Sequence, residues 1–270
     1  MNRRLRTAIA ALGLLVTITL AGCDALSTEP TYGGLSIAGF NYTPYNLVRF
    51  VITDRYGNRA SGGGDLMPGS GEGSLSCCYK LKGTEFTVKW EVYDADEAIL
   101  SLRAKQPIKV IQKTAAVRMP PTKISGDLGS IVLGLHFYPD DHVEFEFRTD
   151  LRGTRIFYDD VWDWLRKTHG PLLNPHQEHE TSVVFRRAAR LAAEGWNKYR
   201  FTDTADLQQY AYFTLLNPNF DQHPAVRKII EQTKGRPGAF GEAMDNIAPK
   251  ILEELKGKQF KPSPTGDFDD

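Results

Sequence analysis

The chain has 270 residues, and 41% of them are hydrophobic, which is enough for a core in one large domain or in two domains of ordinary size. Lysine and arginine together number 33, and so do aspartate and glutamate, so the formal net charge is zero. A chain with this balance has no global basic field to attract nucleic acid, and we therefore expect no nucleic-acid partner.

The N-terminal segment departs from this average composition. Three arginines precede an uncharged run over residues 7–21, which is too short and too close to the N-terminus for a comfortable spanning helix. This pattern is typical of a secretory signal peptide, which we assign to residues 1–22. The run ends in Leu20-Ala21-Gly22-Cys23, which resembles the lipobox of bacterial lipoproteins. The resemblance implies cleavage before Cys23, a diacylglycerol on its thiol and a lipidated tether over residues 23–31.

These features predict a mature protein that is anchored on a membrane and faces the periplasm. Removal of the signal peptide leaves 30 basic and 33 acidic residues, and no later segment is apolar enough to span a bilayer. Multiple acyl chains anchor a protein stably, so the membrane is an expected partner through the lipid alone. Asp24, directly after the lipidated cysteine, resembles the enteric signal for retention at the inner membrane. We favour the inner membrane and leave the outer membrane open.

The next part of the chain, to about residue 150, has a hydrophobic period of two, as in strands buried on one face. No long amphipathic helix interrupts it, so we predict an antiparallel β-sandwich-like domain of six to eight strands over residues 32–152. The clearest alternations lie at residues 48–52, 86–92 and 143–147, and further apolar runs lie at residues 35–40, 99–102, 108–111 and 131–137.

The remaining chain has the period of helices, and we predict a helical domain over residues 153–257. The expected helices are a first one near residues 157–165 that stops at Gly170-Pro171, a second over 178–194 capped by Gly195, a third from Asp203 to Asn217-Pro218, a fourth opened by Pro224 and a last one over 239–255 broken by Pro249. The predicted fold class is α+β, with an N-terminal antiparallel β-sandwich-like domain followed by a C-terminal helical domain. Residues 258–270, which contain two prolines, are predicted to be disordered.

A glycine-rich stretch in the β half is the first candidate for a functional surface. It is not a phosphate loop, because no Gly-Lys-Ser/Thr follows the glycines and their spacing misses the dinucleotide-binding pattern. We interpret it as a loop that a rigid sheet presents to a partner, and a flexible surface connection is at least as good an interpretation. The candidate partner-binding residues are Gly62, Gly63, Gly64, Asp65, Gly69, Gly71 and Gly73.

Cys77 and Cys78 follow this stretch and are the only thiols besides Cys23. On a regular strand, neighbouring side chains point to opposite faces, which favours two free thiols, one of them buried. The alternative is a vicinal disulfide formed in an oxidising periplasm. Both alternatives stay open at the level of the sequence.

Catalytic and metal-binding patterns find little support in the chain. His176 and His179 lie three positions apart, which does not fit the spacing of a metalloprotease helix, and no serine lies in a Gly-x-Ser-x-Gly turn. The neighbouring acids Asp140-Asp141 and Asp159-Asp160 fit a turn and a helix N-terminus better than a glycosidase pair. We therefore expect no enzyme, no metal site and no cofactor.

An ordered set of features in the β half resembles a domain of proteobacterial lipoproteins that are encoded beside type VI secretion phospholipase effectors. The resemblance covers residues 35–148 and rests on the lipobox and on Asn41-Tyr42-Thr43, Gly62-Gly63-Gly64, Ser76-Cys77-Cys78, Val88-Lys89-Trp90 and the segment 135–143. It implies a membrane-anchored immunity protein that binds and neutralises a cognate secreted lipase-type effector. The helical half, around Phe201-Thr202-Asp203 and residues 220–224, is similar to segments of type VI accessory proteins. The alternative function is therefore a secretion-system adaptor that binds or loads an effector.

Overall fold

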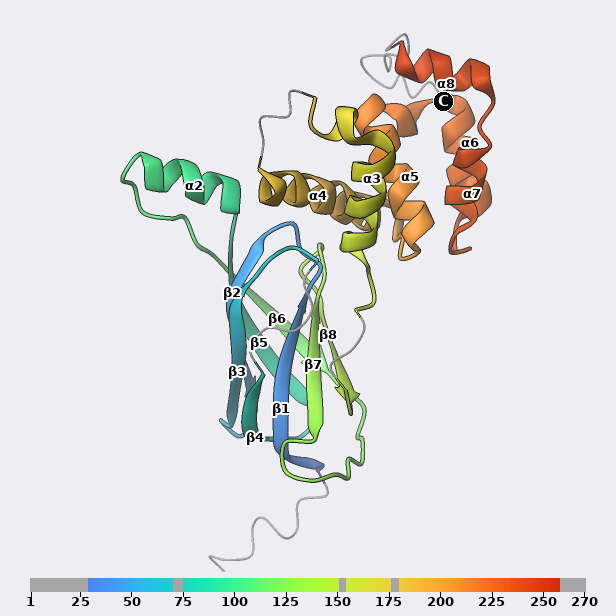
Figure 1. The fold of residues 1–270 in the computed structure, drawn as a ribbon. Coiled ribbons are helices and arrows are strands. Elements are labelled where there is room, and N and C mark those ends of the chain that lie inside the picture. The colour runs from blue at the N-terminus through green and yellow to red at the C-terminus, as the bar shows by residue number, and fades with distance from the viewer. Residues whose placement is uncertain (1–28, 70–74, 151–153, 176–179, 258–270) are drawn as a thin grey trace, which may run out of the picture.

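The computed structural model describes residues 29–69, 75–150, 154–175 and 180–257 (Figure 1). The predicted signal peptide, the lipidation site Cys23, Asp24 and the predicted disordered tail lie outside these residues. The described chain has a β-sandwich in its N-terminal half and a group of helices in its C-terminal half, so the predicted α+β fold class is confirmed.

Eight strands form two four-stranded sheets, with the orders β4-β1-β7-β8 and β3-β2-β5-β6. Neighbouring strands run antiparallel except β1 and β7, which pair in parallel from Leu35 with Ile131 to Asn41 with Phe137. The sandwich is therefore rich in antiparallel pairs without being wholly antiparallel. The strands are β1 (Thr31–Asn41), β2 (Asn46–Asp54), β3 (Arg59–Leu66), β4 (Ser76–Lys82), β5 (Glu85–Tyr93), β6 (Ile111–Arg118), β7 (Ile131–Phe137) and β8 (Val143–Arg148).

The alternating sequence of β5 shows how the sandwich core forms. Phe86, Val88, Trp90 and Val92 are buried, whereas the residues between them are exposed or half-buried. One face of the strand thus joins the core between the sheets and the other face meets solvent. β7 differs, because all its residues are buried. It is an inner strand, and its outer face is covered where the helices pack.

Two predicted strands are wrong, and two strands went unrecognised. Residues 99–102 belong to a helix, α2 (Ala95–Arg103), whose N-terminus is capped by Asp94: this carboxylate accepts from the backbone N–H groups of Asp96 and Glu97 at 2.8 and 3.2 Å. A four-residue apolar run does not distinguish strand from helix, so the cap decides. The run 108–111 mostly precedes a strand, because β6 starts only at Ile111. β3 and β4 went unrecognised because the first is glycine-rich and neither has a regular apolar alternation.

The C-terminal half contains α3 (Tyr158–Leu173), α4 (Thr181–Tyr199), α5 (Thr204–Leu216), the short 3₁₀ helix η1 (Phe220–Gln222), α6 (Pro224–Thr233), α7 (Ala239–Asp245) and α8 (Pro249–Lys256). Three predicted boundaries are confirmed: Asp203 caps α5, Pro224 opens α6, and a break before Pro249 separates α7 from α8. Within the described ranges, no helix has the length and apolar character needed to cross a membrane.

Two predicted helix ends are wrong. α3 does not stop at Gly170-Pro171 but continues to Leu173 across a kink at His169, whose φ and ψ are −135° and 27°. Proline has no backbone N–H to donate within a helix, and the kink accommodates Pro171 without this hydrogen bond. Gly195 lies inside α4, where a Cβ would come within 2.7 Å of the Tyr210 ring, and the helix ends at Arg200 in the left-handed conformation. Gly195 is therefore required for close packing and not for capping.

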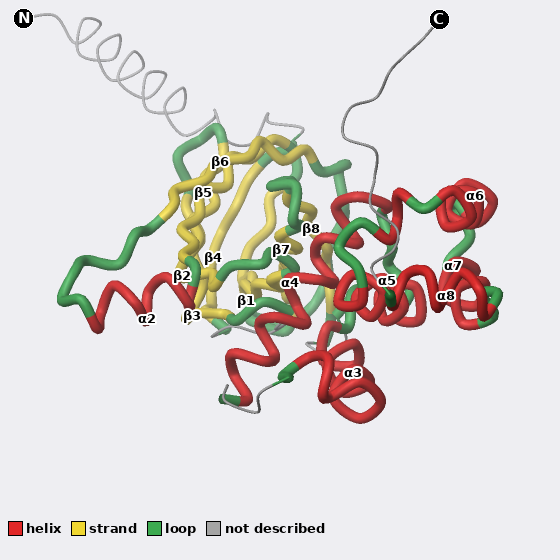
Figure 2. The backbone as a smooth tube through the Cα atoms, turned by 90° about the horizontal axis from the view of Figure 1, so that it is seen from above, coloured by secondary structure: helices red, strands yellow, loops and turns green. Residues whose placement is uncertain are grey.

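The two halves share one hydrophobic cluster. Phe40 and Tyr42, at the end of β1, pack in the same cluster as Val161 and Leu165 of α3 and Ala188 of α4. The hydroxyl of Tyr158 also donates to the backbone oxygen of Tyr42 at 2.9 Å. Figure 1 shows the helices gathered at one end of the sandwich, with the first described residues at the opposite end, and Figure 2 shows the same helices from above. The helical half therefore completes the burial of β1 and is not a separate body on a linker.

Candidate partner-binding face

The glycines at 62–64 lie in β3, an edge strand, so the predicted loop is wrong at these positions. A Cβ on Gly62 would lie 2.5 Å from the Phe50 ring in the core. Gly63 has a φ of +134°, and its Cβ would lie 2.5 Å from the backbone oxygen of Val48, where the register between β2 and β3 shifts. Only glycine fits such a close approach between neighbouring backbones. These glycines are fixed parts of the sheet.

Asp65 and Gly69 are also held in place. The carboxylate of Asp65 accepts from the Tyr93 hydroxyl at 2.9 Å and from the Asn46 side chain at 3.2 Å. The N–H of Gly69 donates to the backbone oxygen of Asn41 at 2.7 Å, and a Cβ there would meet Tyr158 at 2.6 Å. Gly71 and Gly73 lie outside the described residues. The structure thus gives five of the seven candidate residues a role in the fold, and their contact with a partner stays a prediction.

Cys77 and Cys78 are joined by a disulfide in the structure, which is one of the two alternatives left open by the sequence. They lie on β4, an edge strand of the other sheet, and both are exposed. A Cβ on Gly129 would come within 3.0 Å of the Cys77 sulfur, so the disulfide lies against the turn before β7. It is therefore on a different sheet from the glycines that precede it in sequence.

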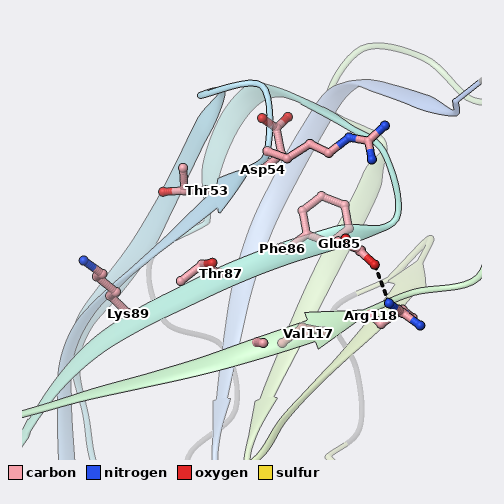
Figure 3. A pocket seen from close by; sticks show the side chains of 10 residues that line it. Thr53, Asp54, Glu85, Phe86, Thr87, Lys89, Val117 and Arg118 are labelled. Carbon is pink, nitrogen blue, oxygen red and sulfur yellow. Dashed lines mark hydrogen bonds and ion pairs between the residues drawn. The ribbon is translucent and has the colours of Figure 1, made fainter. Parts of the chain in front are cut away.

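The outer face of the sheet β3-β2-β5-β6 forms a shallow groove, here called the sheet groove. It consists of two adjoining hollows of about 660 and 570 Å³ that share Thr53 and Lys89. Figure 3 shows the first of them. Alternation along the strands sends every second side chain outward, and the hollows lie between these side chains. The outward residues along the groove are Arg49, Val51, Thr53, Arg59, Glu85, Thr87, Lys89, Glu91, Gln112, Thr114, Ala116 and Arg118.

The charges at this groove are mostly paired at its rim. Arg49 donates to both carboxylate oxygens of Glu91, at 2.8 and 2.6 Å, and this hydrogen bonding holds the pKa of Glu91 below its ordinary value. Arg118 pairs with Glu85 at the other end (Figure 3). Lys89, in the middle of the groove, has no hydrogen-bond or ion-pair partner among the described residues. Arg59, at the β3 edge of the groove, likewise has no such partner within the described ranges, so the groove presents two unpaired cations among short side chains.

This arrangement suits recognition of a partner surface better than chemistry on a small molecule. The hollows are open, and charged side chains make up half of the residues that line each of them, with threonines, alanine and valines between them. Across the ranges that the structure describes, no group of three or more His, Cys, Asp or Glu side chains is placed to hold a metal ion. His176 and His179 lie outside those ranges. Asp140 pairs with Arg200 and His142, and Asp159 and Asp160 lie in the first turn of α3.

A buried histidine lies where the helices meet the sandwich. The Nδ1 atom of His136 is 3.0 Å from the Tyr42 hydroxyl, its Nε2 atom is 2.9 Å from Glu146, and its ring stacks on Phe40. Burial, and then the nearby positive charge of Arg155, lower the pKa of His136 to about 4. The ring is therefore neutral at pH 7, and the group has a structural role between the two halves.

We expect this histidine to make the protein less stable as the pH falls. In the unfolded chain it takes up a proton near pH 6.5, whereas the folded protein binds that proton only near pH 4. Its contribution to the free energy of unfolding is complete above pH 6.5 and is lost progressively between 6.5 and 4, with a total of about 3 kcal/mol. Urea unfolding at a series of pH values measures this loss.

A His136→Gln variant should be less stable at pH 7.5 but should lose less stability than the wild type on going to pH 4.5. His142→Gln is the matched control, because the side chain of His142, on the neighbouring turn, is partly exposed at 42% and its substitution leaves His136 in place. Equal pH slopes for the wild type and His136→Gln would contradict the assignment.

Residues in the sheet groove were not recognised from the sequence as functional. Lys89 and Thr87 were visible as the outward positions of the 86–92 alternation, but such positions are ordinarily a solvated strand face. The part of the groove that β6 contributes could not be placed from the sequence. Residues 99–102 were predicted as a strand although they belong to α2, and the next strand was predicted from residue 108 although β6 starts at Ile111. The missing information was which strands lie side by side.

Comparisons with protein-family models, with curated proteins and with solved structures found no match for this chain. The sheet groove is therefore assigned from its geometry.

Proposed function

We propose that the mature chain is a membrane-anchored periplasmic immunity lipoprotein that binds and neutralises a type VI secreted phospholipase-type effector. In this proposal Cys23 carries the lipid, the inner membrane is favoured by Asp24, and the protein acts by binding rather than by catalysis. The toxin class comes from the resemblance of residues 35–148, and the site comes from the structure.

The observation that supports binding is the open sheet groove. Its residues project from four hydrogen-bonded strands, so they are already ordered before a partner arrives. Stable protein complexes ordinarily bury about 1,600 Å² in total, with a few residues supplying most of the affinity. An exposed sheet face of three or four strands offers a surface of that order. Lys89 at its centre is the candidate anchor for a carboxylate on the effector.

Lipid anchoring fits this role because it concentrates the inhibitor at the surface where a phospholipase must act. Confinement to a surface raises the effective concentration of one partner for the other without adding any contact. We therefore expect the lipidated chain to protect cells at lower expression than a soluble form exported with the same domains. The difference is measured as the survival of sensitive cells that produce one form or the other, at a series of expression levels, when they are exposed to the effector.

The proposal is tested by measuring binding between the chain without residues 1–23 and the secreted lipase encoded beside it. We expect a stable complex, and we expect Lys89→Thr to weaken it about tenfold, because a charge that is paired in the interface is lost. Lys80→Thr is the matched control: it removes an exposed lysine from β4, on the other sheet. Absence of a complex, together with absence of protection in sensitive cells, would contradict the proposal.

The alternative function, an adaptor that loads an effector, is favoured by one feature of the helical half. A hollow of about 490 Å³ between the α4–α5 connection and the end of α6 is lined by Tyr199, Phe201 and Ile230 among polar residues. An adaptor that uses this hollow should lose its effector on Ile230→Ser and retain it on Lys89→Thr. The immunity proposal expects the opposite pattern.

A further inference from the structure

An apolar surface stands apart from the core on the excursion between β5 and β6. This excursion comprises α2 and the segment that returns to β6, residues 95–110, and is here called the α2 arm. Half of the exposed large hydrophobic residues of the described chain lie on it. Their exposed fractions are 37% for Ile99, 62% for Leu100 and for Leu102, 37% for Ile108 and 46% for Val110. Such a concentration of exposed apolar side chains marks an interaction site more often than chance exposure does.

The α2 arm is firmly held. Arg186 of α4 donates to Asp96 at 3.0 and 2.6 Å, and its own side chain is only 7% exposed. Arg190, one turn later on α4, pairs with both Asp94 and Asp96. These contacts fix the N-terminal, acidic end of α2 and leave Leu100 and Leu102 outward. A surface that is already ordered loses little conformational entropy when it binds.

The charge of the exposed part is one-sided. From residue 98 to residue 110 the chain contains Arg103, Lys105 and Lys109 and no acid, and all three cations are exposed. The complementary surface is therefore apolar with carboxylates at its border.

The position of the α2 arm relates it to the sheet groove. The arm leaves β5 just after Glu91 and returns to β6 just before Gln112, and both of these residues line the groove. The arm also extends from the sandwich on the side away from α6, α7 and α8 (Figures 1 and 2). A partner seated in the groove would thus meet the arm at the upper end of the same sheet.

The position also argues against the anchoring membrane as the occupant. The described chain starts at the far end of the sandwich from the helices and the arm (Figure 1). From the proposed anchor at Cys23 to residue 30, the chain reaches at most about 28 Å when fully extended. β1 alone, with 11 residues, covers about 36 Å. The tether is shorter than the sandwich, which favours an arm directed toward a protein.

We propose that the α2 arm is a docking element that places its leucines against an apolar, acid-bordered surface of the secreted lipase. This inference rests on the proposed function and names a second contact for the same partner. An enzyme that takes up acyl chains needs an apolar entrance, and covering it would keep lipid out. The groove supplies polar recognition, and the arm supplies apolar burial.

The test uses the mature full chain and the neighbouring lipase. Leu100→Ser combined with Leu102→Ser should weaken binding about 100-fold, because two leucines lose their burial in the complex. Leu75→Ser combined with Leu128→Ser is the matched control, since these leucines are 46% and 80% exposed and lie outside the arm. It should bind as the wild type does. Thermal unfolding of both double variants should stay close to that of the wild type, because all four side chains are exposed.

The charge is tested separately by Lys109→Glu, which should slow association about tenfold at low salt and much less at high salt. Lys228→Glu, on the exposed side of α6, is the control and should leave the association rate unchanged.

The outcomes separate the two proposals. If the wild type binds the lipase and the variant with Leu100→Ser and Leu102→Ser binds it equally well, the docking inference alone is overturned. No complex with the wild type overturns the proposed function and the inference with it. If the wild type binds vesicles of anionic phospholipid and only the arm variant loses this binding, the arm is assigned to a membrane. If the wild type self-associates in sedimentation equilibrium and only the arm variant does not, the arm is assigned to a second copy of the chain. Either result also overturns the inference.

Discussion

A chain that ends at residue 152 is expected to aggregate or to remain partly unfolded. Without the helices, Phe40, Tyr42 and Val132 lose the partners that bury them, although each is at most 5% exposed in the full chain. Exposure of a large apolar side chain costs about 1.5–3 kcal/mol, so together with Tyr138 the loss is comparable to the whole stability of a small domain, about 5–15 kcal/mol. The Tyr42 hydroxyl also loses the backbone N–H of Arg155, at 2.9 Å.

Size-exclusion chromatography and thermal unfolding by circular dichroism measure this effect. The matched control is a chain that ends at residue 257, which keeps every described residue and should match the full chain in elution volume and melting temperature. A monomeric 152-residue product with a cooperative transition near that temperature would contradict the shared core. Because of this core, loss of binding after removal of the helices does not locate the partner surface, and point variants are the sharper tool.

Gly63→Ala is expected to destabilise the protein by about 4 kcal/mol. The new Cβ would lie 2.5 Å from the Val48 backbone oxygen and 2.6 Å from the Arg49 Cα, and neither backbone atom can move without disturbing the pairing of β2 with β3. A φ of +134° adds strain for any residue with a side chain. Urea unfolding at pH 7.5 measures the change in free energy.

Two glycine controls separate crowding from conformation. Gly57 has a φ of +87° with nothing within 4 Å of a Cβ, so Gly57→Ala should cost about 1 kcal/mol from conformation alone. Gly33 has open space and no positive φ, so Gly33→Ala should be close to neutral. If Gly63→Ala unfolds like Gly57→Ala, the glycines at 62–64 are a tolerant loop, as the sequence first suggested.

The fold class was predictable from the sequence because its signals are local and repeated. β5 keeps a strict alternation over nine residues, and α5 has an N-cap at one end and Asn217-Pro218 at the other. Errors arose where one local signal fits two structures. Gly195 follows a helical pattern as a cap would, yet it lies inside α4 because the ring of Tyr210 packs against it. Such a contact joins two helices, and a pattern within one helix does not contain it.

The candidate site was less predictable for a related reason. The glycines attracted notice as an unusual composition, but their cause is the Phe50 ring and the backbone of β2, which the sequence places elsewhere. The sheet groove brings Thr53, Lys89 and Thr114 together from three strands, and each looks unremarkable within its own strand. Strand order determines this neighbourhood, and strand order depends on pairing between distant segments.

The parallel pairing of β1 with β7 has a consequence for how the protein matures. β1 lies between β4 and β7, so the first strand of the domain completes its hydrogen bonding only when a strand near the end of the domain is present. Contacts between such distant segments make folding slow. Under the proposed export, β1 could not complete its pairing before most of the sandwich had been synthesised, and this slow folding would leave the chain unfolded, and so competent for transport, before it enters a narrow channel.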